Sequence, residues 1–138
     1  MSQAALETAG LTKFYGKTCG IEDLDLRVEE GEVFGYLGPN GAGKTTTIRL
    51  LLDLIRPTRG SASIAGHDTR SESVEVRRLI GYLPGELKLP ARVTALHYLS
   101  YLGNLRGRPG LRVVHELAAR LELDLERRLG DLSKGNKQ

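Results

Sequence analysis

The residues whose types and spacing fit a chemical role lie in one short stretch of the chain, residues 38–45, with the sequence GPNGAGKT. This stretch matches the pattern GxxxxGK[ST] in full. Its glycines allow a tight bend in which several backbone N–H groups point at one place, as phosphate oxygens require. Lys44 adds a full positive charge for the β- and γ-phosphates, and the Thr45 hydroxyl is placed to ligate Mg²⁺. The pattern therefore predicts a site for a nucleoside triphosphate.

The elements on either side of this loop have the order that such a site needs. The apolar run Glu32–Leu37 predicts a short buried strand, and Lys44–Ile55 carries apolar residues at helical spacing. The helix adds the positive end of its dipole at the loop. A glycine turn that merely caps a helix is the alternative interpretation, and the order of strand, loop and helix argues against it.

Further predicted elements alternate along the chain. Leu24, Leu26 and Val28 alternate with charged residues, which is typical of a half-buried strand that ends at the turn 29–31. The sequence also predicts strands over Ser61–Ala65 and Leu79–Leu83, a short helix over Ser73–Arg78, a helix capped by Thr94, a break over Gly107–Gly110, a second amphipathic helix after the break, and the entry to another helix over residues 131–135. Strands mixed with helices indicate an α/β layered domain.

Composition excludes several classes of protein. The chain has 138 residues, a formal net charge of +3 and the make-up of an ordinary globular domain. The lone Cys19 excludes a disulfide scaffold, and no apolar run approaches the roughly 20 residues of a membrane span. Residues 1–10 carry no secretion signal, so we expect a cytoplasmic protein.

The basic residues are concentrated in the second half, where 13 Lys and Arg accompany 9 Asp and Glu after residue 66. A polyanion-binding face is one interpretation, and a solvated helix surface is the other. The arginines are scattered among Leu and Glu without interleaved aromatic residues, so we favour the solvated surface and expect no nucleic-acid partner. His67, His97 and His115 lack the spacing of metal ligands and are interpreted as surface or packing residues.

Residues 37–47, LGPNGAGKTTT, resemble the ATP-binding subunit of ABC transporters. Three other segments agree with this family in order and spacing. Residues 11–16, LTKFYG, resemble its aromatic loop, with Tyr15 in the position that stacks on adenine. Residues 79–85 resemble the strand that leads into the glutamine loop, and residues 132–138, LSKGNKQ, resemble a divergent signature sequence. The similarity is greatest to the subfamily that powers drug-resistance and other ABC-2-type exporters.

This resemblance implies the α/β fold of the P-loop NTPases in its ABC ATPase form, here incomplete. Residues 1–85 would form the nucleotide-binding core with an antiparallel β-subdomain, and residues 86–138 the helical subdomain up to the signature. The implied cofactors are ATP and Mg²⁺. The residues implied to bind the nucleotide are Tyr15, Gly38, Pro39, Asn40, Gly41, Ala42, Gly43, Lys44, Thr45 and Thr46, with Thr45 also on Mg²⁺, and Ser133 and Gly135 acting in trans.

The implied partners are a second ATP-binding domain, paired head to tail, and an integral membrane permease subunit. Ser133 and Gly135 would then bind the γ-phosphate of the opposite subunit's nucleotide. The protein would be cytoplasmic, held at the inner face of the cell membrane only through the permease, and would couple ATP binding and hydrolysis to export.

Two motifs depart from the family pattern. Gly85 stands where the family usually has Gln, with the adjacent Glu86 as its substitute, and the signature carries Lys134 and Asn136 in place of Gly and Gln. By spacing alone, Tyr15 is equally well interpreted as a strand-edge aromatic residue that packs on the core.

In the family, the signature is followed by the Walker B Asp, the catalytic Glu and the switch His. None of these three is found in residues 1–138. We therefore expect the N-terminal portion of an ATPase subunit, which binds phosphates but scarcely hydrolyses them. The alternative is a truncated, non-hydrolysing nucleotide-binding remnant. A P-loop kinase or GTPase is a weaker interpretation, because there is no guanine-selecting NKxD sequence and the signature-like ending fits neither group.

Overall fold

The computed structural model divides the chain into two units, Met1–Gly81 and Tyr82–Gln138. It describes residues 4–85, 87–107 and 110–137. The glycine-rich loop, residues 38–45, and Tyr15 belong to the first unit, and the signature-like sequence, residues 132–138, belongs to the second.

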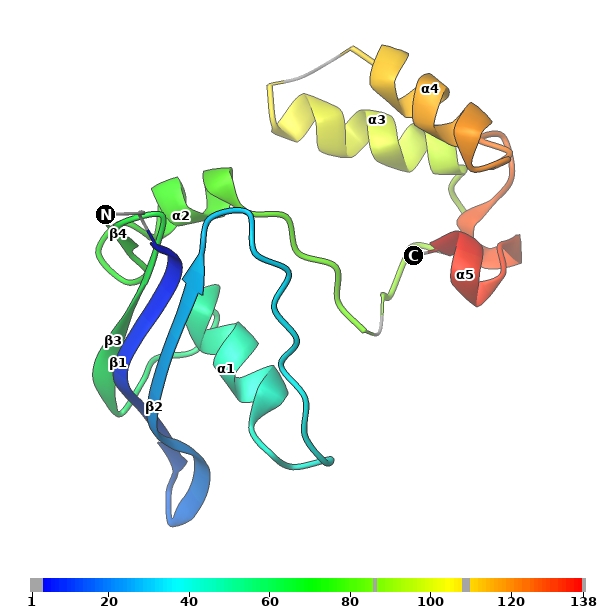
Figure 1. Cartoon of the computed structure of the whole chain (residues 1–138). Coiled ribbons are helices and arrows are strands. Elements are labelled where there is room, and N and C mark those ends of the chain that lie inside the picture. Colours follow the sequence, from blue (N-terminus) through cyan, green and yellow to red (C-terminus); the bar gives the residue numbers. More distant parts are fainter. Residues whose placement is uncertain (1–3, 86, 108–109, 138) are drawn as a thin grey trace. The chain divides into compact units, whose positions relative to one another are not determined.

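The first unit contains a four-stranded antiparallel sheet in the order β2-β1-β3-β4 (Figure 1). The long strands β1, Ala4–Tyr15, and β2, Thr18–Glu29, form a hairpin whose turn contains Gly16 in a left-handed conformation. β3, Arg59–Ile64, pairs with β1, and the short β4, His67–Asp68, completes the sheet. The hairpin brings Tyr15 opposite the first residue of β2.

Helix α1, Lys44–Leu51, packs on one face of this sheet (Figure 1). The buried core between them consists of Leu11, Ile21, Leu50 and Ala62. Removing apolar side chains from water is the main favourable term here, so this core holds α1 against the sheet through Leu50, near the end of the helix.

The end of α1 lies before the predicted end at Ile55. Asp53 adopts a left-handed conformation with φ of 53°, and the Leu54 N–H donates to the Arg49 carbonyl at 2.9 Å. The Asp53 N–H donates to the Leu50 carbonyl at 3.0 Å. These two bonds close the helix as a Schellman motif does. The prediction placed the break at the following Pro and Gly and missed this earlier stop.

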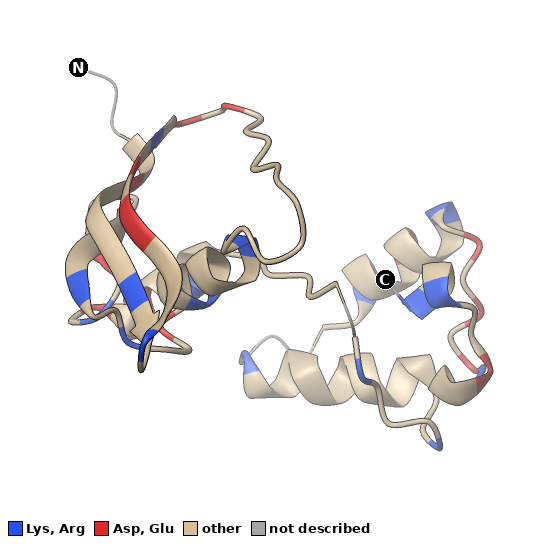
Figure 2. Cartoon of the chain, turned by 90° about the horizontal axis from the view of Figure 1, so that it is seen from below, with Lys and Arg blue, Asp and Glu red and all other residues tan. Residues whose placement is uncertain are grey.

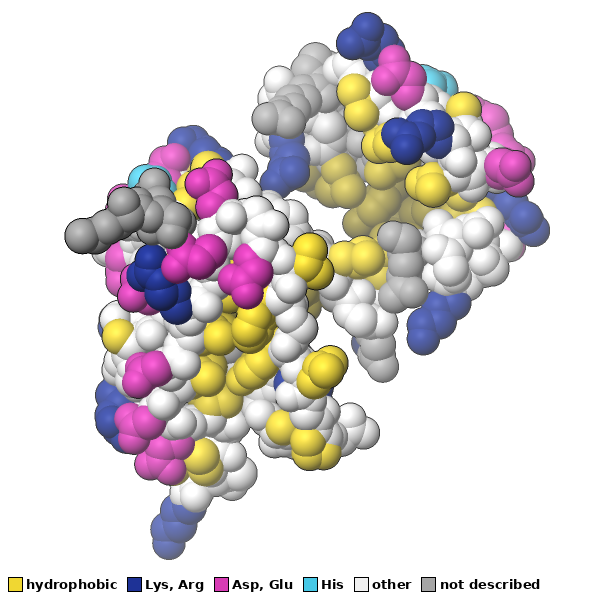
Figure 3. All heavy atoms as spheres, in the orientation of Figure 1, with side chains coloured by type: hydrophobic (Ala, Val, Ile, Leu, Met, Phe, Trp, Pro, Cys, Tyr) yellow, Lys and Arg dark blue, Asp and Glu magenta, His cyan; other side chains and the backbone are white. Residues whose placement is uncertain are grey.

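The two predicted apolar strands, Glu32–Leu37 and Leu79–Leu83, are wrong. Both segments are without a strand partner in the part of the chain that the structure describes, and α2, Ser73–Leu79, extends into the second. Val33 is 99% exposed and Leu37 is 91% exposed, so the first segment is not buried either. A strand is defined by hydrogen bonds to a neighbouring strand, and apolar composition alone does not supply that neighbour. Apolar side chains therefore remain open to solvent on the first unit (Figure 3).

Strand β1 is present although the sequence pattern did not predict it. Its buried positions include Thr8 and Thr12, which are polar residues, so the apolar alternation that marks a strand is hidden. The Thr8 Oγ1 donates to the Leu24 carbonyl at 2.8 Å, and the Thr12 Oγ1 accepts from the Asp23 N–H at 3.0 Å. Each buried hydroxyl is thus hydrogen-bonded to β2, and the Thr12 hydroxyl also donates to the Gly10 carbonyl of β1 at 3.0 Å. The predicted half-buried strand through Leu24 is confirmed as part of β2.

The second unit is helical. It contains α3, Ala95–Leu105, α4, Arg112–Arg120, a turn of 3-10 helix over Leu129–Asp131, and α5, Lys134–Lys137. The buried core consists of Ala95, Ala118, Leu125, Leu129 and Leu132. The predicted cap of α3 is confirmed, because the Thr94 Oγ1 accepts from the His97 N–H at 3.2 Å.

Lys and Arg positions of the second unit are spread over its helices and loops, with acidic positions between them (Figure 2). The Arg112 Nε lies 3.7 Å from the Glu116 Oε1, one helical turn away, and both side chains are largely exposed. Charges of both signs thus lie at solvent-exposed positions of α4. Within the described ranges, no helix has both the length and the apolar character needed to cross a membrane.

The cap of α3 gives a direct test of how this unit is held together. Thr94→Ala removes the acceptor for the His97 N–H and is expected to lower the free energy of unfolding by about 1 kcal/mol. Thr94→Ser keeps the acceptor and should stay close to the parent. Urea denaturation followed by circular dichroism measures both. Equal stability of the Ala and Ser variants would contradict the capping role.

Candidate functional site

The glycine-rich loop lies between the extended segment that follows β2 and the start of α1. Gly41 and Gly43 adopt left-handed conformations, with φ of 87° and 83°. The Ala42 N–H donates to the Pro39 carbonyl at 3.2 Å, which closes the turn, and the Thr47 N–H donates to the Gly43 carbonyl at 2.8 Å, which starts the helix. The first N–H groups of a helix have no partner inside it, so the start of α1 presents donors toward the loop.

Gly43 is fixed against β2. A Cβ at this position would clash with the Ile21 side chain and would lie 2.6 Å from the Gly20 carbonyl oxygen. Only glycine combines the left-handed backbone with this close approach. The loop is therefore anchored to the hairpin strand as well as to its own helix.

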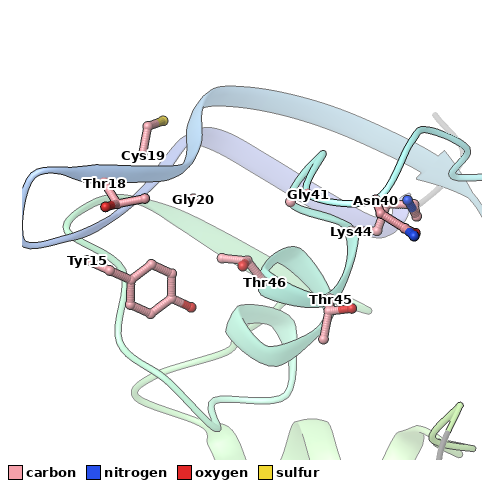
Figure 4. Close-up of a pocket in the computed structure, with 10 residues that line it drawn as sticks. Tyr15, Thr18, Cys19, Gly20, Asn40, Gly41, Lys44, Thr45 and Thr46 are labelled. Carbon is pink, nitrogen blue, oxygen red and sulfur yellow. The ribbon is translucent and has the colours of Figure 1, made fainter.

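A hollow of about 350 Å³ lies between the hairpin and the loop (Figure 4). This volume is within the range of about 300–1,000 Å³ that is usual for small-molecule sites. The residues that line it are Tyr15, Thr18, Cys19, Gly20, Asn40, Gly41, Gly43, Lys44, Thr45 and Thr46. The hollow thus brings the aromatic residue of the hairpin together with most of the glycine-rich loop.

Lys44 is bound by carbonyl groups of its own loop. Its Nζ donates to the Gly38 carbonyl at 2.5 Å and to the Pro39 carbonyl at 2.7 Å. The ammonium group is thereby held across the bend of the loop, beside the hollow that Lys44 helps to line. Both acceptors are neutral, and a charged acceptor would bind the ammonium group more strongly.

Tyr15 ends β1 and its ring points toward Thr46 of α1 (Figure 4). The residue is 46% exposed, so part of it stays open to solvent at the end of the strand. A Cβ at Gly20 would lie 2.9 Å from the Tyr15 Cε2 and 3.3 Å from the Thr46 Cγ2. The absence of a side chain at Gly20 is what lets the ring and the helix approach the same piece of β2.

Sequence analysis missed Thr18, Cys19 and Gly20 as lining residues of the hollow. They carry no recognisable chemical pattern, and only the hairpin pairing of Tyr15 with Thr18 puts them there. The available signal was the glycine at position 16, which is typical of a tight turn and would have placed the residues after it opposite Tyr15. Gly38, Pro39 and Ala42 were predicted and form the bend of the loop behind the lining residues.

The other predicted site residues lie in the second unit. The Ser133 Oγ accepts from the Asn136 N–H at 3.2 Å at the start of α5, and Ser133 and Gly135 are both exposed. Gly85 lies in an irregular segment, and Glu86 lies outside the described residues.

His67 forms a hydrogen bond with a carboxylate five residues along the chain. Its Nδ1 lies 2.8 Å from the Glu72 Oε1, and this hydrogen bond lowers the pKa of the Glu72 carboxyl. Among the residues that the structure describes, three or more His, Cys, Asp or Glu side chains do not gather anywhere in a group that would hold a metal ion.

Comparison with known proteins identifies the family of this chain. The protein family described as ABC transporter matches residues 21–138, which is most of the chain. The chain belongs to this family. The fold expected from the sequence, the P-loop NTPase fold of ABC ATPases, is confirmed by similarity to a solved structure described as an ATP binding subunit of an ABC transporter, with a TM-score of 0.79, 31% identity, and coverage of 96% of this chain and 57% of that one.

Two curated ABC relatives are similar in sequence. The daunorubicin/doxorubicin resistance ATP-binding protein DrrA of Streptomyces peucetius is 46% identical over 103 residues, which cover 75% of this chain and 31% of the relative. The ABC transporter ATP-binding protein NatA of Bacillus subtilis is 41% identical over 129 residues, which cover 86% of this chain and 50% of the relative. The chain therefore spans half or less of the length of these relatives.

The contact of Gly43 with β2 can be tested by comparing two glycines of the same glycine-rich loop. Gly41→Ala meets an unfavourable backbone conformation with open space around it, which costs about 1–2 kcal/mol. Gly43→Ala meets the same backbone penalty and the clash with β2, so the free energy of unfolding should fall by about 2–5 kcal/mol. Guanidinium denaturation of both variants measures the difference. Equal losses would mean that the loop does not rest on β2.

Proposed function

We propose that this chain forms the nucleotide-binding part of an ATP-binding subunit that drives export through a separate membrane permease. The observation that carries the proposal is that the glycine-rich loop, Lys44 and Tyr15 line one hollow of suitable size. Membership of the ABC transporter family and the printed names of the relatives, which are ATP-binding proteins, support it.

The triphosphate binds at the loop and the start of α1. Backbone N–H groups and the positive end of the helix dipole face its oxygens. Phosphate oxygens replace the Gly38 and Pro39 carbonyls as the acceptors for Lys44, because a charged acceptor is stronger than a neutral one. Asn40, Gly41, Ala42, Gly43 and Thr46 complete the loop around the phosphates. The adenine base stacks on Tyr15 at the other end of the hollow.

A Mg²⁺ ion fits the donors available at this site. Mg²⁺ usually keeps several waters and takes only one or two protein oxygens together with substrate phosphates, and Thr45, one of the residues that line the hollow, carries one hydroxyl. When bound, the ion neutralises charge on the β- and γ-phosphates. The chain's own contribution is to orient the triphosphate so that the Thr45 hydroxyl and the Lys44 ammonium act on the same end of it.

The proposal includes the domain division and the partners implied by the family. Residues 1–85 serve as the nucleotide-binding core and residues 86–138 as the helical subdomain. Two ATP-binding domains pair head to tail, and the exposed Ser133 and Gly135 bind the γ-phosphate held by the other subunit. The pair is attached at the cytoplasmic face of the membrane through the permease.

Lys44 provides the primary test of nucleotide binding. At ATP concentrations near 100 times the dissociation constant, the chain should gain about 2.7 kcal/mol of stability. Lys44→Ala should lose this gain, since the charge that faces the phosphates is removed. Lys17→Ala removes an exposed lysine in the hairpin turn and should keep it.

Thermal unfolding with and without ATP measures these gains, and the scans without ATP report whether each variant is folded. An ATP-induced gain that persists in a folded Lys44→Ala variant would place the phosphate site elsewhere.

Thr45 provides a test of the metal. ATP should stabilise the parent chain more in the presence of Mg²⁺ than in EDTA. Thr45→Ala should reduce the Mg²⁺-dependent part by roughly 1 kcal/mol or more, in line with the loss of a polar contact to a charged group, and leave the part seen in EDTA unchanged. Thr45→Ser keeps the hydroxyl and is the matched control. An undiminished Mg²⁺ effect in Thr45→Ala would remove Thr45 from the metal site.

A further inference from the structure

We infer that Lys13 is a positioning residue for the base of the nucleotide, because its ammonium group covers one face of the Tyr15 ring and holds the ring so that the other side faces the hollow. The inference rests on the proposed function, since it concerns how the base of ATP is received. It assigns a role to a lysine that the phosphate-loop pattern does not include.

The contact that carries the inference is between a cation and an aromatic ring. The Lys13 Nζ lies over the Tyr15 ring, 5.3 Å from its centroid. This distance is within the limit of about 6 Å for a significant cation–π interaction. The same Nζ donates to the Arg56 carbonyl at 2.6 Å. The ammonium is therefore held at a point from which it fixes the ring.

The segment that carries the Arg56 carbonyl is bound to β1 two residues further along, at Thr58. The Phe14 N–H donates to the Thr58 Oγ1 at 3.0 Å, and the Thr58 N–H donates to the Thr12 carbonyl at 2.8 Å. The segment after α1 and the end of β1 are thus bound to each other on both sides of Lys13. Lys13 and the carbonyl that holds it belong to one locally rigid piece.

The two sides of the ring differ. Tyr15 lines the hollow, whereas Lys13 is not among its lining residues, so the ammonium acts on the ring from behind the wall of the hollow. On the hollow side, the ring edge lies against the bare backbone of Gly20 and the ring points toward Thr46 (Figure 4). A ligand in the hollow meets the aromatic surface and does not meet the ammonium directly.

This arrangement affects the base and not the phosphates. A cation on one face draws the π electrons of the ring toward itself, which makes the opposite face a better partner for an electron-rich purine. The contact with Lys13 also limits rotation of the Tyr15 side chain, since Tyr15 is 46% exposed. Less conformational freedom is therefore lost when the base stacks. A cation–π contact at an exposed site corresponds to about a two- to five-fold change in dissociation constant.

The test compares a ligand that has a base with one that has none. Isothermal titration calorimetry measures the dissociation constants of Mg·ATP and of inorganic tripolyphosphate with Mg²⁺. Lys13→Met should weaken ATP binding about two- to five-fold and leave tripolyphosphate binding unchanged. Lys13→Arg keeps a cation and should restore ATP binding. Lys17→Met makes the same charge change in the hairpin turn and should alter neither ligand.

The Tyr15→Leu background separates this role from a general structural one. In that background Lys13→Met should cause no further loss of ATP affinity, because the ring on which Lys13 acts is gone. Equal weakening of ATP and tripolyphosphate by Lys13→Met would overturn the inference, as would an unchanged ATP affinity or the same loss in the Tyr15→Leu background. Failure of the parent chain to bind either ligand would instead contradict the proposed function, and the inference with it.

Discussion

The close contact between Gly43 and the backbone of β2 at Gly20 fixes the position of the phosphate loop. A Cβ on Gly43 would lie 2.6 Å from the Gly20 carbonyl oxygen, so this approach exists only because position 43 has no side chain. The core of Leu11, Ile21, Leu50 and Ala62 holds α1 against the same strand. The helix start, the loop and the hairpin are thereby built around one short piece of β2.

The same piece of strand sets the distance between the two ends of the hollow. Gly20 faces the Tyr15 ring and Thr46, and its carbonyl faces Gly43. The Tyr15 ring and the glycine-rich loop are far apart in sequence, and both are positioned by contacts with Gly20. The chemistry of Lys44 and Thr45 is common to many nucleotide-binding proteins, whereas this spacing decides which ligand reaches both ends.

The sequence predicted what depends on local backbone chemistry. The glycine loop, the start of α1 and the Thr94 cap follow from residue types whose conformational preferences act within a few positions. The predicted strands Glu32–Leu37 and Leu79–Leu83 failed, because a strand depends on a neighbour that the residues themselves do not specify. The lining residues Thr18, Cys19 and Gly20 were missed for a related reason. They are brought to the hollow by the hairpin pairing and not by any chemical signature of their own.

The most direct test is to follow backbone amide chemical shifts by ¹H–¹⁵N NMR while Mg·ATP is added. The largest changes are expected in the loop and helix start, residues 40, 41 and 43–46, and in the hairpin, residues 15 and 18–20, because all of these residues line the same hollow. Changes confined to other parts of the chain, or changes in the loop with none in the hairpin at saturating ATP, would contradict a single site that receives both the phosphates and the base.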